Sequence, residues 1–284
     1  MKYCVIDIGS NSVRLMLNEN GVTVYKKVKM TRLAENLGKE RFLCSEAINR
    51  TVNAVKEFYF EAKKENPLKI YIFATAAVRQ AKNGSEFCQI IRRETGLCVD
   101  VVSGEIEAKL GVMGALKGEN GGLIDIGGAS TEVAIIEADK RFSKSYKIGA
   151  GTLTERLMSE NLNKVLDEIF YDLPSDLNNK FTAIGGTATS VSAMMQELEI
   201  YNPKLVDGFF IKKENLLSLK EKLSSLSVNE IAKLKGLQKG RERVIYAGVC
   251  ILFYLMDKLN LSGVFVSESD NLEGYLQYIR GENE

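Results

Sequence analysis

One short string occurs twice in the sequence, and this repeat constrains the fold more than any other feature. "DIGSNS" at residues 7–12 and "DIGGAST" at residues 125–131 lie 118 positions apart. Each string follows an apolar run and precedes alternating apolar residues, which is typical of a β-hairpin with a glycine turn. A unit this long is not a solenoid repeat. The sequence therefore predicts a duplicated α/β domain, with one copy over residues 1–118 and the second over residues 119–284.

The order of the predicted elements indicates the architecture of each half. Three strands come first, and helices then alternate with strands, which is the pattern of a mixed sheet with helices packed on it. No linker rich in Pro, Gly or Ser separates the halves, so we expect two directly joined domains with a cleft between them. The strands are expected over 2–7, 13–18, 22–29, 70–74, 97–102, 123–125, 131–137, 141–147, 181–185 and 264–267, and the helices over 45–66, 84–95, 105–116, 152–170, 188–198, 213–223, 227–235, 241–258 and from 271.

The composition excludes several classes of chemistry. A net charge of +1 gives no overall field that would favour nucleic acid or a membrane surface. The chain contains no His, which excludes Ser-His-Asp and Cys-His catalysis and leaves Asp, Glu, Lys, Tyr or Cys as a general base. Most of the five cysteines lie among apolar residues, and no signal peptide opens the chain, so we expect a cytoplasmic protein. The longest apolar stretch, residues 244–256, is shorter than a membrane span and predicts a buried helix.

Each repeated string has the composition of a phosphate loop beside an acid. Glycine permits turn conformations that other residues avoid, and successive N–H groups in such a turn can bind an anion. Asp7 and Asp125 would repel a phosphate unless a cation intervened, and Mg²⁺ bridges carboxylate and phosphate oxygens. The sequence therefore predicts metal carboxylates at Asp7 and Asp125. It predicts phosphate contacts from Gly9, Ser10, Asn11 and Ser12 in the first loop, and from Gly127, Gly128, Ala129, Ser130 and Thr131 in the second.

Six strings, spread in order over nearly the whole chain, resemble the exopolyphosphatase / guanosine pentaphosphate phosphohydrolase family. They are "IDIGSNSVRLML", "ATAAVRQAKN", "VSGEIEAKLG", "IDIGGASTEVAI", "AIGGTATSVSAM" and "RERVIYAGVCIL". The family lies within the actin, sugar-kinase and heat-shock chaperone superfamily. The resemblance implies two ribonuclease-H-like (actin-like ATPase) domains with mixed five-stranded sheets, in the short two-domain form. It also implies that Gly185, Gly186 and Thr187 bind phosphate or a nucleoside at a helix start.

Hydrolysis of a phosphoanhydride needs a group that activates water. Glu105 and Glu107 lie two positions apart at a helix start, so only one of them can face a given cleft. Glu107 shares its face with Gly111 and Gly114, which leave room for a close neighbour. The resemblance implies that Glu107 is the catalytic carboxylate. It also implies that Glu132 lies near the metal or the attacking water.

Arginines are the candidates for neutralising phosphate charge, because a guanidinium gives fixed, bidentate contacts. Arg79 follows the strand at 70–74, and Arg32 follows the third strand. The resemblance supports Arg79 most strongly, as a catalytic residue. Gly149-Ala150-Gly151-Thr152 is a further glycine turn between a strand and a helix, for which we expect a structural role.

Three positions depart from the family pattern. Ala129 stands where the family usually has a third glycine, Asp207 where a His is common, and Leu272 where an Arg often precedes Glu-Gly. These differences concern substrate choice more than the reaction type.

Three functions are compatible with these residues. The first is a Mg²⁺-dependent hydrolase, with Mn²⁺ as the alternative ion, which releases terminal phosphate from inorganic polyphosphate or guanosine pentaphosphate. The second is a small-molecule kinase of the same superfamily, and the third is a non-catalytic protein that binds guanosine penta- or tetraphosphate. The Glu107 segment and the extent of the resemblance favour the hydrolase. We expect no DNA, RNA or membrane partner, and a homodimer stays open as the oligomeric state.

Overall fold

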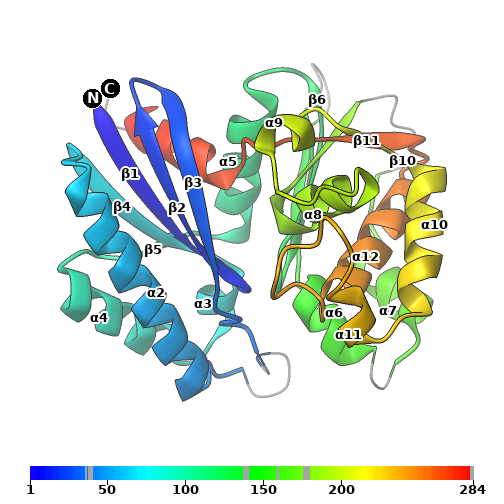
Figure 1. Ribbon diagram of the computed structural model, residues 1–284, viewed down its shortest axis with the longest axis horizontal. Helices are drawn as coiled ribbons and strands as arrows, with labels where there is room; N and C mark the ends of the chain where they lie inside the picture. Colours follow the sequence, from blue (N-terminus) through cyan, green and yellow to red (C-terminus); the bar gives the residue numbers. More distant parts are fainter. Residues whose placement is uncertain (36, 38–40, 137–140, 158–159, 175–179, 282–284) are drawn as a thin grey trace. The chain divides into compact units, whose positions relative to one another are not determined.

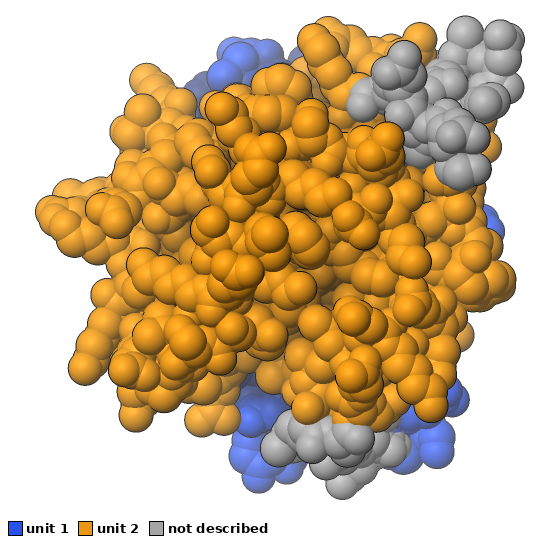
Figure 2. Space-filling view, turned by 90° about the vertical axis from the view of Figure 1, so that its right-hand side faces the viewer, with its two compact units in different colours: residues 1–107, 278–284 blue, residues 108–277 orange. Residues whose placement is uncertain are grey.

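The computed structural model describes residues 1–35, 37, 41–136, 141–157, 160–174 and 180–281 (Figure 1). It divides into two compact units, one formed by Met1–Glu107 with Tyr278–Glu284 and the other by Ala108–Gln277, which Figure 2 colours separately. The boundaries fall inside helices α5 (Gly104–Leu116) and α13 (Asn271–Gly281). The sequence repeat predicts a boundary after residue 118, and these limits of the duplication stay a prediction.

The first unit is built on a mixed five-stranded sheet, as predicted, and its strand order is β3-β2-β1-β4-β5. The first three strands form an antiparallel meander, whereas β1, β4 and β5 run parallel. The strands are β1 (Lys2–Ile8), β2 (Ser12–Glu19), β3 (Val22–Met30), β4 (Lys69–Ala74) and β5 (Asp100–Val101).

Alternation along β1 decides which face of this sheet each side chain enters. Cys4, Ile6 and Ile8 belong to a core that also contains residues of α2 (Ser45–Lys64) and α4 (Gly84–Thr95). Successive strand residues point to opposite faces, so Asp7 projects from the face that α2 and α4 do not cover. A short helix, α3 (Ala76–Gln80), which the sequence did not predict, follows β4.

The second unit contains a six-stranded sheet in the order β10-β11-β9-β6-β7-β8, one strand more than predicted. The additional strand, β10, has only three residues, too few for an alternating pattern to show in the sequence. Strands β6, β9 and β11 run parallel, and β6, β7 and β8 form the second antiparallel meander. The strands are β6 (Gly121–Ile126), β7 (Thr131–Ile136), β8 (Arg141–Tyr146), β9 (Phe181–Ile184), β10 (Phe210–Lys212) and β11 (Gly263–Val266).

Eight helices of the described chain accompany this sheet in addition to α5. They are α6 (Ala150–Arg156), α7 (Leu162–Ile169), α8 (Gly185–Met195), α9 (Pro203–Val206), α10 (Lys213–Ser224), α11 (Val228–Ile231), α12 (Ile245–Lys258) and α13. The helices predicted over 152–170 are the pair α6 and α7, and residues 158–159 lie outside the described residues.

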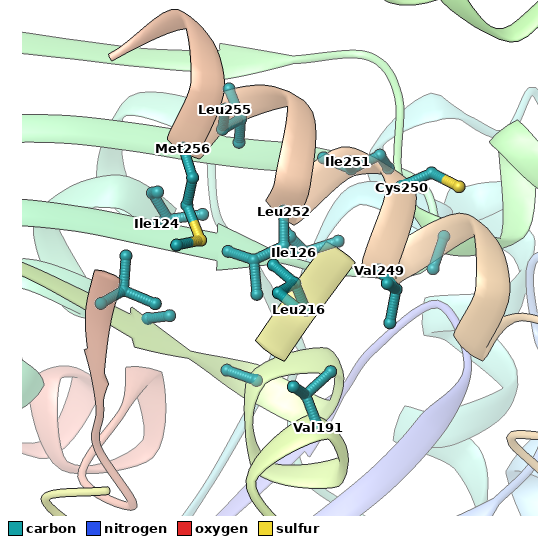
Figure 3. Packing of buried hydrophobic residues seen from close by; sticks show 14 of the residues in the cluster. Ile124, Ile126, Val191, Leu216, Val249, Cys250, Ile251, Leu252, Leu255 and Met256 are labelled. Carbon is teal, nitrogen blue, oxygen red and sulfur yellow. The ribbon is translucent and has the colours of Figure 1, made fainter. Parts of the chain in front are cut away.

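Two apolar clusters cover the two faces of the second sheet. On one face, Ile124 and Ile126 pack with Leu252 and other residues of α12 (Figure 3). On the other face, Leu123 and Ala134 pack against α5. By alternation, Asp125 shares the α5 face with Leu123. The predicted buried helix at 244–256 is confirmed as α12, and within the described residues no helix combines the length and the apolar character needed to cross a membrane.

Candidate functional site

The carboxyl ends of three parallel strands bring the predicted residues of the first unit together. Asp7 lies near the end of β1, Arg79 follows β4 on α3, and Glu107 follows β5 on the first turn of α5. The carboxyl ends of parallel strands lie at one edge of a sheet, which is the usual position of ligand sites in α/β proteins. The first loop, residues 9–12, begins at the same edge.

Arg14 is the positive partner that the buried Asp7 requires. The two residues lie directly opposite each other in the β1–β2 hairpin. The Arg14 Nε and Nη2 atoms donate to Asp7 Oδ2 at 2.8 and 2.5 Å. Sequence reasoning missed Arg14, although counting outward from the predicted turn would have paired position 7 with position 14. The sequence analysis assigned a metal to balance Asp7, but in the structure a guanidinium already balances it.

Glu107 is buried, whereas Glu105 is exposed, so the prediction that only one of these acids faces inward is confirmed. Arg79 Nη1 donates both to Glu107 Oε2 at 2.9 Å and to the Val102 carbonyl at 2.7 Å. The two hydrogen bonds connect the Arg79 guanidinium both to the backbone after β5 and to the Glu107 carboxylate. This contact offsets the cost of burying the Glu107 carboxylate.

One backbone hydrogen bond closes the first loop, and the segment that follows β3 donates further backbone hydrogen bonds to it. The Gly9 N–H donates to the Ser12 carbonyl at 3.0 Å. The Asn11 carbonyl accepts from the N–H groups of Thr31 and Arg32. These bonds turn loop carbonyls away from a prospective anion. Arg32 adopts a φ of +50°, a conformation that a non-glycine residue adopts at a cost.

The second loop closes in the same way, with the Gly127 N–H donating to the Ser130 carbonyl at 3.0 Å. Gly9 was expected to adopt a conformation forbidden to most residues, but neither Gly9 nor its counterpart Gly127 has a positive φ. Their role is close approach, because a Cβ at either position would lie 3.1 or 3.2 Å from the serine carbonyl oxygen that closes the loop.

The segment at 149–152 supports the second loop, in agreement with its predicted structural role. The Gly127 carbonyl accepts from the Ala150 N–H, and the Gly128 carbonyl accepts from the N–H groups of the next two residues. A Cβ at Gly149 would lie 2.5 Å from the Gly127 carbonyl oxygen, so only glycine fits against the loop. Counted from the repeat, this segment corresponds to residues 31–34 of the first unit.

Asp125 and Glu132 form a pair of buried acids in the second unit. They lie directly opposite each other in the β6–β7 hairpin and therefore project from the same face. Glu132 Oε1 accepts from Ser145 Oγ at 2.6 Å, and Asp125 Oδ2 accepts from Asn271 Nδ2 at 2.9 Å. The equivalent position of the first unit holds Arg14, so the two halves differ in sign at this point.

The Asp125–Glu132 pair has the chemistry of a Mg²⁺ site. Two carboxylates side by side in a sheet destabilise each other unless a cation or a proton reduces their charge. Among the described residues, no group of three or more Cys, Asp or Glu side chains could hold a metal ion. Mg²⁺ is suited to such a sparse site, because it binds through one or two carboxylates and completes its shell with water and substrate phosphates.

Gly185 and Thr187 fit against the end of β6 beside this pair. Gly185 has a φ of +79°, and a Cβ there would lie 2.4 Å from Asp125 Oδ1. Thr187 Oγ1 donates to the Ile126 carbonyl at 3.3 Å. Gly186 lies against the guanidinium of Arg241, since a Cβ at this position would fall 1.9 Å from Nη1. Arg241 lies in one of the six strings, yet sequence reasoning did not single it out.

A polar cluster beside Arg241 includes a half-buried tyrosine. Tyr201 donates to Glu268, and burial, followed by the charge of Glu268, raises the pKa of the tyrosine, while Arg241 acts in the opposite direction. Asp207 Oδ1 accepts from the Glu268 N–H at 2.9 Å. The residue found where the family often has His therefore supports this cluster.

Ala129, Thr131 and Leu272 are buried. Ala129 is fully buried, so its methyl group packs in the interior. Thr131 Oγ1 donates to the Ile148 carbonyl at 2.7 Å, which commits its proton to the backbone. Leu272, at the position of the expected arginine, is also fully buried.

The chain is similar to known proteins over most of its length. The model of the Ppx/GppA phosphatase family matches residues 18–279. Exopolyphosphatase 2 of Mycobacterium tuberculosis is 25% identical, over 99% of both chains. A guanosine-5'-triphosphate,3'-diphosphate pyrophosphatase of Pseudoalteromonas translucida is 30% identical over 96% of this chain. A bifunctional 3-dehydroquinate synthase/phosphatase of Fusobacterium nucleatum is 30% identical over 95% of this chain. The chain spans 58% and 45% of the length of these last two relatives.

A solved structure of a family member has the same fold over the whole chain. The Ppx/GppA family member of Aquifex aeolicus is 26% identical, has a TM-score of 0.78, and aligns over 100% of this chain and 99% of its own. The family match begins within β2 and covers the second sheet, the second loop and the segments that carry Arg79, Glu107 and Glu132. The chain therefore belongs to the Ppx/GppA phosphatase family.

Proposed function

We propose that the protein hydrolyses terminal phosphoanhydride bonds of inorganic polyphosphate or guanosine pentaphosphate. The observation that carries the proposal is the buried Glu107 carboxylate, held at a sheet edge by Arg79. Relatives named as an exopolyphosphatase and as a guanosine pentaphosphate pyrophosphatase support this reaction class. A match to a phosphatase family favours this function over the kinase and the non-catalytic binder.

Glu107 acts as the general base in this proposal. The carboxylate accepts a proton from water, the water oxygen forms a bond to the terminal phosphorus, and the bridging P–O bond breaks. The products are orthophosphate and a chain shortened by one phosphate. Arg79 holds the carboxylate in one orientation through its hydrogen bond to Glu107 Oε2.

The phosphate loops bind oxygens of the substrate through backbone N–H groups and hydroxyls. The supporting bonds from residues 31–34 and 149–152 turn several loop carbonyls away, which favours an anion at each loop. Arg32, Gly185 and Gly186 are proposed as further phosphate contacts.

The Asp125 and Glu132 carboxylates would hold the divalent cation. Their position on one face of the β6–β7 hairpin supports this assignment. When bound, Mg²⁺ or Mn²⁺ neutralises charge on the substrate phosphates and on the leaving group. Asp7 was predicted as a second metal carboxylate, but its contact with Arg14 favours a metal site formed by the second unit.

The decisive experiment measures phosphate release by purified protein from polyphosphate and from guanosine pentaphosphate, with Mg²⁺ or Mn²⁺. We expect Glu107→Gln to reduce turnover about 10²–10⁴-fold, because a general base contributes that much. Glu105→Gln is the matched control, since it changes an exposed acid on the same helix turn and is expected to leave turnover unchanged. Absence of release from both substrates, or full activity of the Glu107 variant with native circular dichroism, would reject the proposal.

A further inference from the structure

We propose that Asn271 is a positioning residue for the Asp125 carboxylate. Asn271 Nδ2 donates to Asp125 Oδ2 at 2.9 Å, and both residues are at least 93% buried. They lie 146 positions apart in the sequence, so only the fold brings them together. The inference rests on the proposed function, in which Asp125 holds the divalent cation.

The backbone of Asn271 is fixed by a cap at the start of α13. The Leu272 N–H donates to Asp270 Oδ1 at 2.9 Å, and the Asp270 N–H donates to Glu273 Oε2 at 3.0 Å. Reciprocal bonds of this kind fix a helix start. Because Asn271 stands between the two capping residues, its main chain has little freedom to move away from Asp125.

Close packing by α5 fixes the side chain of Asn271 as well. A Cβ at Gly111 would lie 3.1 Å from Asn271 Oδ1, which is close enough to push the amide. One turn further along α5, a Cβ at Gly114 would lie 2.0 Å from the Asp270 carbonyl oxygen. The glycines on this face of α5 therefore leave room for the start of α13 and for the Asn271 amide beside Asp125.

The amide orients the acid without cancelling its charge. In the first unit, the equivalent Asp7 receives a guanidinium, which supplies a full positive charge. Asn271 is neutral, so its hydrogen bond adds no positive charge to the Asp125–Glu132 pair. Residues that orient metal ligands typically change metal affinity or activity 10–100-fold when they are removed.

The test compares Mn²⁺ binding by wild type, Asn271→Leu and Asn271→Ala, measured from the free Mn²⁺ signal in electron paramagnetic resonance. Leucine has a similar size and no donor, and the alanine variant serves if the leucine variant does not fold. We expect Mn²⁺ binding about 10–100-fold weaker, with a matching rise in the Mg²⁺ concentration for half-maximal phosphate release. Asn163→Ala, at an exposed helix position, is the control and should bind Mn²⁺ like wild type.

Asp125→Asn separates the two proposals. If this variant loses Mn²⁺ and the Asn271 variants bind it with wild-type affinity, the positioning role is overturned and the proposed function stands. A lower melting temperature with unchanged Mn²⁺ affinity would show a purely structural role for Asn271 and would also overturn it. If wild type neither binds Mn²⁺ nor releases phosphate, both proposals fail.

Discussion

Two buried acids of the first unit, Asp7 and Glu107, each contact a guanidinium. Asp7 receives Arg14, and Glu107 receives Arg79, in each case through contacts of 2.5–2.9 Å. Burial of an acid without such a partner would cost several kcal/mol, on the order of the penalty for an uncompensated buried charge. We therefore expect that replacing the arginine partner of a buried acid impairs the acid itself.

Replacement of Arg79 should slow the reaction, because Glu107 would lose the contact that orients its carboxylate. We expect Arg79→Met to lower turnover about 10²-fold, because a misplaced catalytic group has an effect of this size. Arg79→Lys keeps the charge but cannot reproduce the planar group that contacts both Glu107 and Val102, so an intermediate loss is expected. Steady-state phosphate release measures both. Arg93→Lys, at a largely exposed position, is the control. Wild-type turnover by Arg79→Met would contradict the assignment.

The buried thiol of Cys4 should make stability depend on alkaline pH. Burial, with a smaller contribution from Glu65, raises the pKa of Cys4 from 9.0 to about 11. The unfolded chain loses this proton first, so the contribution is complete below pH 9 and is lost as the pH rises toward 11. Between these values, wild type should lose on the order of 1 kcal/mol more stability than Cys4→Ala.

Denaturant unfolding at pH 8 and pH 10.5 under reducing conditions measures this difference. Cys98→Ala replaces an exposed thiol and should keep the wild-type response. An equal loss in wild type and Cys4→Ala would show that the Cys4 thiol does not contribute.

At the scale of elements, each phosphate loop depends on the segment that follows the third strand of its meander. In the first unit this segment contains Arg32 in a left-handed conformation, and in the second it contains the start of α6. Both segments donate N–H groups to loop carbonyls. The loop sequence alone therefore does not determine the loop conformation.

Gly149→Ala should displace the second loop. Its Cβ would lie 2.5 Å from the Gly127 carbonyl oxygen and 2.6 Å from the Ala129 nitrogen, and both are backbone atoms. We expect kcat/KM for phosphate release to fall about 10-fold or more, with a folded protein by circular dichroism. Gly281→Ala, where a Cβ meets nothing within 4 Å, is the matched control. Equal kinetics for the two variants would show that the second loop does not depend on Gly149.

At the scale of the whole molecule, the two halves contain the same hairpin geometry but place residues of opposite charge opposite the acid, Arg14 in the first half and Glu132 in the second. Position 14 and position 132 are equivalent in the repeat, and each faces the acid of its own loop. The first pair is neutral overall, whereas the second places two acids together. The two hairpins thus share one backbone geometry but differ in charge. The Asp7–Arg14 pair balances its own charge, whereas the Asp125–Glu132 pair suits a cation.

Equivalent substitutions in the two halves should therefore shift stability in opposite directions. Arg14→Met removes the guanidinium that contacts the buried Asp7 and should lower the free energy of unfolding by about 2–4 kcal/mol.

Glu132→Gln removes one of two like charges and keeps the acceptor for Ser145. The free energy of unfolding of the metal-free protein should therefore rise by roughly 1 kcal/mol. The same variant should bind Mn²⁺ more weakly. Thermal unfolding in EDTA and Mn²⁺ titration check both. Destabilisation by both variants, with normal Mn²⁺ binding by the second, would contradict this view.

Local pattern was enough to predict most of the fold. The repeat at 118 positions predicted two mixed sheets, and the helix at 84–95 agrees with α4 to the residue. The misses have physical causes. Strand β10 has three residues, and helix α3 has five, so neither is long enough for a period to show. Gly9 was expected to have a positive φ, but it does not. Glycine is needed there because a Cβ would lie too close to the Ser12 carbonyl oxygen.

The sequence by itself determined the strand ends that carry Asp7 and Asp125 and the helix that starts beside Glu107, because these follow from short-range alternation and turn chemistry. It also determined which of Glu105 and Glu107 could share a face with glycine. Only the tertiary structure decided that Arg79 reaches Glu107 and that Asn271 reaches Asp125. These pairs are 28 and 146 positions apart, and such contacts depend on how whole elements pack, which no local period encodes.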